Sequence, residues 1–178
     1  MKSRFEEFCD LPVTLQEEAI REGELRLQSQ LSVASDADKR ALTWAGFLIS
    51  AASALVATTF AIARNESLEV GLVILGAFLS VLLLSAAWLA VESARPSLFS
   101  LPGNSPENWL PSVWDCHGSE EQKRSTARCD QARHIATAIS DNKLSAKRRA
   151  DQMRLSLNLT FFAAFAAVVC MVIYLLLT

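Results

Sequence analysis

The stretch SDADKRALTWAGFLISAASALVATTFAIARNE, from Ser35 to Glu66, decides the fold of this chain. Four charged residues lie between Asp36 and Arg40, a segment that we call the charged collar, and no charged residue follows until Arg64. The uncharged run therefore extends from Ala41 to Ala63. A helix over this run rises about 34 Å, which is enough to cross a bilayer. The run predicts a transmembrane helix that begins directly after the collar.

Two more uncharged runs of similar length follow, from Val70 to Val91 and from Leu155 to Leu177. A soluble bundle would have to bury three helices that are apolar on every face, which is not expected in a chain of 178 residues. A cleaved signal peptide is excluded, because the first run begins only at residue 41, behind a polar and acidic segment. The expected fold class is an all-α membrane protein with three transmembrane helices and long cytoplasmic helical extensions.

The distribution of basic residues predicts the orientation, because Lys and Arg gather on the cytoplasmic side of the spans. Arg64 is the one basic residue in the loop 64–69. Seven basic residues flank the other ends of the three runs: Lys39, Arg40, Arg95, Lys147, Arg148, Arg149 and Arg154. We therefore expect the N-terminus in the cytoplasm and the C-terminus outside.

This orientation divides the chain into five expected segments. They are a cytoplasmic N-terminal helix (1–40), a transmembrane helical hairpin (41–91), a cytoplasmic connector rich in Pro and Trp (92–118), a basic cytoplasmic helical segment (119–154) and a third transmembrane helix (155–178).

Both cytoplasmic helices begin with the spacing of a capping box, Thr14 with Glu17 and Ser119 with Gln122. Nothing between Thr14 and Ala63 breaks a helix, so we expect one nearly continuous rod of about 50 residues that transmits a cytoplasmic event to the first span. A kink or break is expected at Ser140 to Asn142, because these residues compete for backbone hydrogen bonds.

The two cytoplasmic helices carry complementary charge. Residues 1–41 hold six basic and nine acidic groups, whereas residues 119–154 hold nine basic and five acidic groups. The acidic helix around Glu17, Glu18, Glu22 and Glu24 is thus one partner for the basic segment. Anionic lipid and a phosphate-rich ligand are the other two. The candidate ligand-binding residues are Lys123, Arg124, Arg128, Arg133, Lys147, Arg148 and Arg149, with Trp109 and Trp114 as candidates for stacking or loop packing.

The three runs contain no ionisable residue, which argues against a proton relay or an ion-coupled transporter. Their neutral polar and small residues are candidates for helix packing or for lining a pore: Gly46, Ser50, Ser53, Ala54, Asn158 and Thr160. Three spans cannot enclose a pore alone, so a channel requires several subunits.

The four cysteines give little indication of a site. Cys9, Cys116 and Cys129 are expected in the reducing cytoplasm and Cys170 in the third span, so no disulfide is expected. Cys116, His117, Cys129 and His134 lack the paired spacing of zinc ligands. No phosphate loop, GxSxG or HExxH motif is present, so we expect neither catalytic residues nor a metal or cofactor.

The order of these parts resembles the small transmembrane effectors of bacterial antiphage signalling, namely the Pycsar transmembrane effectors, the SLATT-type proteins and the Hailong effector. Ala37, Asp38, Lys39 and Ala41 are similar to an Ala-Asp-x-Lys-Ala segment at the entry to the first span, although Lys39 directly follows Asp38 and Arg40 intervenes. Pro96 at the inner end of the second span is the other shared feature.

The resemblance implies a multi-pass protein of the bacterial inner membrane that acts as a homo-oligomer, a ring of about four subunits. It also implies a nucleotide or short oligonucleotide signal, made by a partner nucleotidyltransferase or cyclase, and disruption of the membrane or conduction of ions. The alternative is a non-conducting anchor that presents its cytoplasmic helices to a partner protein.

Overall fold

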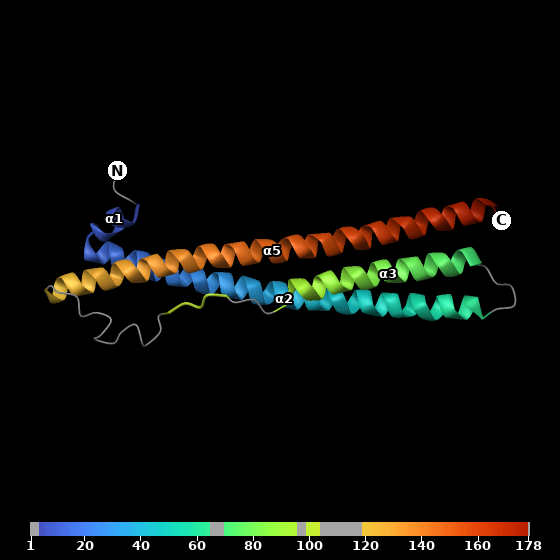
Figure 1. Ribbon diagram of the computed structural model, residues 1–178, viewed down its shortest axis with the longest axis horizontal. Coiled ribbons are helices and arrows are strands. Elements are labelled where there is room, and N and C mark those ends of the chain that lie inside the picture. The colour runs from blue at the N-terminus through green and yellow to red at the C-terminus, as the bar shows by residue number, and fades with distance from the viewer. Residues whose placement is uncertain (1–3, 65–69, 96–98, 104–118, 178) are drawn as a thin grey trace. The chain divides into compact units, whose positions relative to one another are not determined.

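The computed structural model describes residues 4–64, 70–95, 99–103 and 119–177, and all regular secondary structure in these ranges is helical (Figure 1). The helices are α1 (Arg4–Cys9), α2 (Val13–Ala63), α3 (Val70–Ser93) and α5 (Glu120–Leu177). Three of them, α2, α3 and α5, contain a segment long and apolar enough to cross a membrane. The three transmembrane helices expected from the uncharged runs are therefore confirmed as helices of the right length and composition.

The two longest helices, α2 and α5, are unbroken over 51 and 58 residues. The expected continuous helix from Thr14 to Ala63 is confirmed. The kink or break expected at Ser140 to Asn142 is wrong, because α5 runs through it. The Asn142 side chain does not compete for its own backbone but exchanges two hydrogen bonds with the backbone of Ser100.

The described residues form two compact units, and each long helix contributes to both. Unit 1 lies within Met1–Ala34 and Ser97–Ala146, and its core is Leu27 of α2 packed on Ile135 and Ala138 of α5. Unit 2 lies within Ser35–Pro96 and Lys147–Thr178, and its core is Leu48 of α2 packed on Ala86 and Ala87 of α3.

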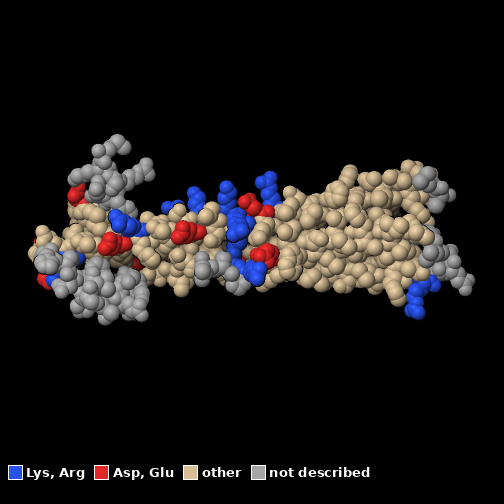
Figure 2. All heavy atoms as spheres, in the orientation of Figure 1, with Lys and Arg blue, Asp and Glu red and all other residues tan. Residues whose placement is uncertain are grey.

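Small residues carry the helix packing of unit 2. Ala41, Ala45 and Ala52 of α2 are buried, as are Ala86 and Ala90 of α3. Side chains this small let helix backbones approach closely, which is the usual basis of helix association in lipid. Outside this contact, Figure 2 shows a broad surface over the apolar parts of α2, α3 and α5 without charged side chains.

Gly76 of α3 lies close to Thr59 of α2. A Cβ atom at this position would overlap the Thr59 hydroxyl and lie 3.2 Å from the Thr59 Cβ and Cγ2 atoms. We expect Gly76→Ala to destabilise the purified protein by about 1–2 kcal/mol, because the two helices must separate to admit the methyl group. Thermal unfolding in detergent measures the loss.

Gly71 supplies the matched control on the same helix, since a Cβ there meets nothing within 4 Å. Gly71→Ala should leave stability unchanged or raise it slightly, because Ala favours the helix over Gly. Equal effects of the two substitutions would show that α3 does not pack on Thr59.

The short helix α1 was not anticipated from the sequence, and it is joined to α5 by a disulfide between Cys9 and Cys129. The expectation that the chain has no disulfide is therefore wrong. That expectation was based on the reducing conditions of the cytoplasm. The compartment does not indicate which thiols the fold brings together. Since Cys129 is bonded to Cys9, it is not free to act in the zinc set, and Cys116 and His117 lie outside the described residues.

The capping predictions had different outcomes. The box at the start of α5 is confirmed: the Ser119 amide donates to Oε1 of Gln122 (2.9 Å), and the Gln122 amide donates to Oγ of Ser119 (3.3 Å). Helix α2 instead begins at Val13, so Thr14 lies inside its first turn, and the carbonyl of Pro12 accepts the amide of Gln16 (3.1 Å).

Candidate functional site

Unit 1 contains a groove of about 460 Å³ between α2 and α5, which we call the mixed-charge groove. Three guanidinium groups and two carboxylates line it, together with Gln131, Ile20 and Ala127; the charged residues are Arg21, Arg124, Arg128, Glu17 and Glu24. The polar members on each helix are spaced by four and then three residues, namely Glu17, Arg21 and Glu24 on α2 and Arg124, Arg128 and Gln131 on α5, so each set lies on one helix face. The lining carries a net charge of one positive unit at neutral pH.

Two contacts across the groove join the acidic helix to the basic one. Nη1 of Arg128 lies 3.5 Å from Oε1 of Glu17, and Nε2 of Gln131 donates to Oε1 of Glu24 (3.1 Å). Of the three partners considered for the basic segment, the acidic helix is thus supported by these two contacts.

Gln16 bonds to Arg128, one of the residues that line the groove, and is only 2% exposed. Its Oε1 accepts from Nε of Arg128 (3.1 Å), while its Nε2 lies 3.0 Å from the carbonyls of both Cys9 and Leu11. Cys9 is the last residue of α1, so Gln16 satisfies a carbonyl that the end of a helix leaves unpaired. The same contacts hold Arg128 in place, and its side chain is 17% exposed.

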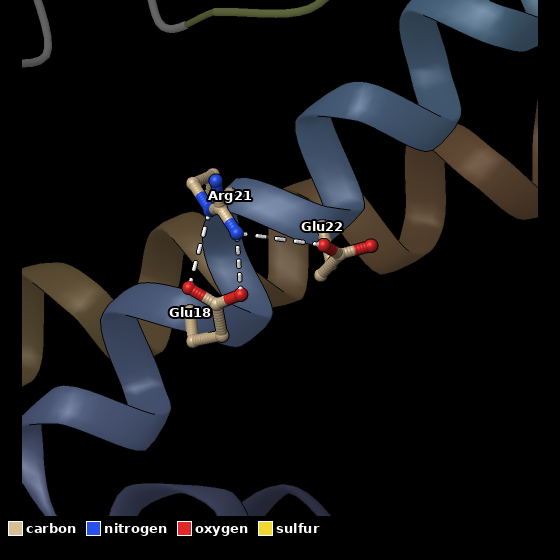
Figure 3. A network of polar contacts seen from close by, with 3 residues as sticks. All are labelled: Glu18, Arg21 and Glu22. Atoms are coloured by element: carbon tan, nitrogen blue, oxygen red, sulfur yellow. Dashed lines mark hydrogen bonds and ion pairs between the residues drawn. The ribbon is translucent and has the colours of Figure 1, made fainter.

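Arg21 at the rim of the groove is engaged on its own helix (Figure 3). Its Nη2 donates to Oε1 of Glu18 (2.6 Å) and lies 3.8 Å from Oε1 of Glu22. The hydrogen bond from Arg21 lowers the pKa of Glu18 below its usual value, and the same bond raises the pKa of Arg21. The contact stabilises the folded state above the pKa of the unfolded carboxyl and is lost as the pH falls through the lowered value. Both side chains are exposed, so the contribution is small.

The structure separates the basic candidate residues into groups with different surroundings. Arg124 and Arg128 line the groove, whereas Lys123 lies 3.8 Å from Glu120 on its own helix and Arg133 lies outside the lining. Lys147, Arg148 and Arg149 belong to unit 2. Trp109 and Trp114 lie outside the described residues. The sequence therefore identified two of the three cations of the groove, and it missed Arg21 and Gln131.

Arg149 has a structural environment that its neighbours lack. Its Nη1 donates to Oδ1 of Asp38 on α2 (2.7 Å), and its Nη2 donates to the carbonyl of Arg95, just beyond α3 (2.6 Å). The side chains of Arg149 and Asp38 are 14% and 32% exposed. We call this arrangement the Arg149 clamp. It joins α5 to α2 and to the end of α3, whereas Lys147 and Arg148 are exposed.

The clamp gives Asp38 of the charged collar a physical role. A guanidinium with a carboxylate on one nitrogen and a carbonyl on another has a fixed position, and both hydrogen bonds are charge-assisted. Asp38 also belongs to the Ala-Asp-Lys segment on which the resemblance rests. The sequence alone showed that the collar was charged but not that one of its carboxylates binds α5.

The neutral polar candidates of the spans lie mostly outside the packed core of unit 2. The side chains of Ser50, Ser53 and Asn158 are exposed, as are Gly46 and Ala54. The hydroxyl of Ser50 donates to the carbonyl of Gly46 (2.9 Å), that of Ser53 to Ile49 (2.8 Å) and that of Thr160 to Ser156 (3.0 Å). The role of these residues in a pore or in packing between subunits stays a prediction.

Ser156 makes a polar contact between two helices of unit 2. It is fully buried, and its hydroxyl donates to the carbonyl of Ala86 on α3 (2.7 Å). A hydroxyl directed at a neighbouring helix has the same sequence signature as one bonded to its own helix. Only the packing of α3 against α5 distinguishes Ser156 from its neighbours.

Residues 26–177 of the chain match a family described as the Pycsar effector protein domain. No curated protein and no solved structure gives a significant match. The matched range contains the charged collar, α3 and all of α5. It begins within α2, so α1, Gln16 and the α2 side of the mixed-charge groove precede it.

Proposed function

Because this chain belongs to the Pycsar effector family, and is thus a membrane effector of antiphage defence, we propose that it forms an ion channel gated by a nucleotide signal. The channel is a homo-oligomer in the bacterial inner membrane. The signal is made by a partner cyclase or nucleotidyltransferase and binds on the cytoplasmic side.

The cytoplasmic placement of unit 1 rests on the basic residues around unit 2. Lys39, Arg40, Lys147, Arg148 and Arg154 are exposed near one set of span ends, and Arg64 is the corresponding residue in the loop at the other set. This asymmetry favours the cytoplasm for the collar side. Lys147 and Arg148 are then available to anionic lipid headgroups.

The mixed-charge groove is the observation that carries the ligand proposal. A cyclic mononucleotide has one negative charge, which matches the one net positive charge of the groove lining. Arg124 is exposed and is the guanidinium we assign to the phosphate. Glu17 and Glu24 are acceptors for the amino and imino groups of a base. A ligand with several phosphates would bind less favourably, because these two carboxylates would repel its additional negative charges.

Conduction requires several copies of the chain, since three spans cannot enclose a pore. A neighbouring subunit or a water-filled pore would supply hydrogen-bond partners for the exposed polar groups of the spans, namely Ser50, Ser53 and Asn158. A nucleotide in unit 1 acts on unit 2 through α2 and α5, because each helix continues without a break from one unit into the other.

We expect Arg124→Gln to weaken the binding of a cyclic mononucleotide by about 10-fold to 100-fold, the value of one lost charge-assisted hydrogen bond. Calorimetric titration of the purified protein measures the affinity. Lys143→Gln is the matched control, because Lys143 is an exposed cation of unit 1 that does not line the groove. If both variants bind as tightly as the unmodified protein, the ligand does not bind in the groove.

A further inference from the structure

The disulfide of unit 1 joins residues that are 120 positions apart in the sequence. Cys9 is the last residue of α1 and is partly exposed, whereas Cys129 lies on α5 and is 9% exposed. Their Cα atoms are 5.7 Å apart, within the range of a native disulfide. One partner is therefore open to small reagents from solution, while the other is held against it by the fold.

Helix α1 has a second attachment that does not depend on sulfur chemistry. Gln16 donates to the carbonyls of Cys9 and Leu11, and its Oε1 accepts from Arg128 of α5. These hydrogen bonds do not involve the sulfur atoms, so we expect them to hold the end of α1 beside Cys129 in the reduced protein as well. The pair of thiols is thereby preorganised, which favours formation of a bond between them over reaction with other thiols.

We propose that Cys9 and Cys129 are a reversible thiol-oxidation site whose co-reactant is a low-molecular-weight disulfide of the glutathione type, and that oxidation fixes α1 on α5. The proposal rests on the cytoplasmic placement of unit 1 proposed above. In that compartment glutathione and thioredoxin keep thiols reduced, so the disulfide is the oxidised state of a responsive pair and not a permanent crosslink.

The exchange proceeds in two balanced steps. The Cys9 thiolate attacks one sulfur of the small disulfide, whose S–S bond breaks and releases one small thiol. The Cys129 thiolate then attacks the Cys9 sulfur of this mixed disulfide and displaces the second small thiol. Two protons pass from the cysteines to the released thiolates, and two electrons pass from the protein to the co-reactant. Cys9 reacts first because it is the more exposed of the two.

The test uses the full chain with Cys116→Ser and Cys170→Ser, which leaves Cys9 and Cys129 as its only thiols. The purified protein is reduced and then equilibrated with mixtures of reduced and oxidised glutathione. Mass spectrometry of non-reduced peptides should find the Cys9–Cys129 crosslink, and reduction should reverse it. The proposal is overturned if oxidised glutathione leaves both thiols free or stops at the mixed disulfide on Cys9.

Hydrogen exchange of the α1 amides tests the structural consequence. We expect exchange at least about tenfold slower in the oxidised protein than in the reduced protein, because the crosslink suppresses local opening. Cys9→Ser should exchange at the reduced rate in every mixture. Gln16→Ala should speed exchange further in the reduced state only. Identical α1 exchange in the oxidised and reduced protein contradicts the tether.

Trapping thiols in intact cells with a membrane-permeant alkylating reagent separates this proposal from the orientation on which it rests. We expect Cys9 to be alkylated in untreated cells and Cys129 to be alkylated when the cells are lysed in denaturant that contains the reagent, whereas a thiol oxidant should protect both cysteines. A pair already oxidised in untreated cells would contradict the cytoplasmic placement as well as the switch. Failure of the purified protein to form the crosslink contradicts the oxidation site alone.

Discussion

Replacing Arg149 with Gln lowers the midpoint of thermal unfolding in detergent by about 4–12 °C, which corresponds to about 2–3 kcal/mol for a chain of this size. The substitution removes the charge that neutralises Asp38 and the hydrogen bond to the carbonyl of Arg95. Asp38 is 32% exposed, so its carboxylate loses its partner in a partly desolvated position. Circular dichroism or intrinsic fluorescence during heating measures the shift.

Arg148→Gln is the matched control, because it removes the same charge from an exposed neighbour on the same helix. Its midpoint should stay within about 1–2 °C of the unmodified protein, as for most exposed substitutions. The double variant Asp38→Asn with Arg149→Gln should lower the unfolding midpoint by less than the sum of the two single changes, because both substitutions act on one contact. Equal shifts for Arg148→Gln and Arg149→Gln would mean that the clamp does not form.

Replacing Asn142 with Leu destabilises unit 1 by about 2–3 kcal/mol, because two hydrogen bonds are lost and the backbone of Ser100 is left without its partners. Asn142 is 1% exposed, accepts the amide of Ser100 (2.9 Å) and donates to its carbonyl (3.1 Å). The apolar side chain cannot replace either bond. Thermal unfolding measures the loss, and hydrogen exchange of the α5 amides around residue 142 locates it.

Asn158→Leu makes the same chemical change on the same helix at an exposed position. It should leave hydrogen exchange of the α5 amides around residue 142 unchanged, because Asn158 belongs to unit 2 and its side chain makes none of the hydrogen bonds described for unit 1. A loss at Asn142 no larger than at Asn158 would contradict the contact between Ser100 and α5.

The transmembrane helices were predictable because a single constraint, the thickness of the apolar bilayer core, determines their length and composition. An uncharged apolar run that is long enough to cross the bilayer has few alternatives to a spanning helix. Two ends also followed from the sequence: α2 ends at Ala63 and α3 begins at Val70, as the charge distribution indicated. The unbroken passage of α2 through the collar was predictable from the absence of Pro.

Contacts between segments far apart in the chain could not be predicted in this way. The Cys9–Cys129 pair and the Ser100–Asn142 pair each depend on how a short segment lies against α5. Asn142 illustrates the difficulty. An Asn in this position suggested a side chain that competes for the hydrogen bonds of the helix backbone. In the folded protein the side chain instead bonds to the backbone of Ser100, and α5 continues without a break.

The candidate site was predictable in its charge but not in its geometry. The complementary charges of the acidic and basic helices made their pairing one of three alternatives, and the contact of Glu17 with Arg128 supports it. The sequence treated nine candidate residues as one surface. The structure places Arg124 and Arg128 in the groove and Arg149 in a clamp, because neighbours on one helix point in different directions.

Ion flux from liposomes that contain the purified protein tests the central claim most directly. Flux is recorded with and without a cyclic mononucleotide, and the subunit number is measured in parallel by mass photometry. We predict an oligomer whose flux changes when the nucleotide is added, and a response that Arg124→Gln shifts to higher nucleotide concentration while Lys143→Gln does not. A monomer that gives no flux with any cyclic nucleotide would contradict the channel and leave a membrane anchor in its place.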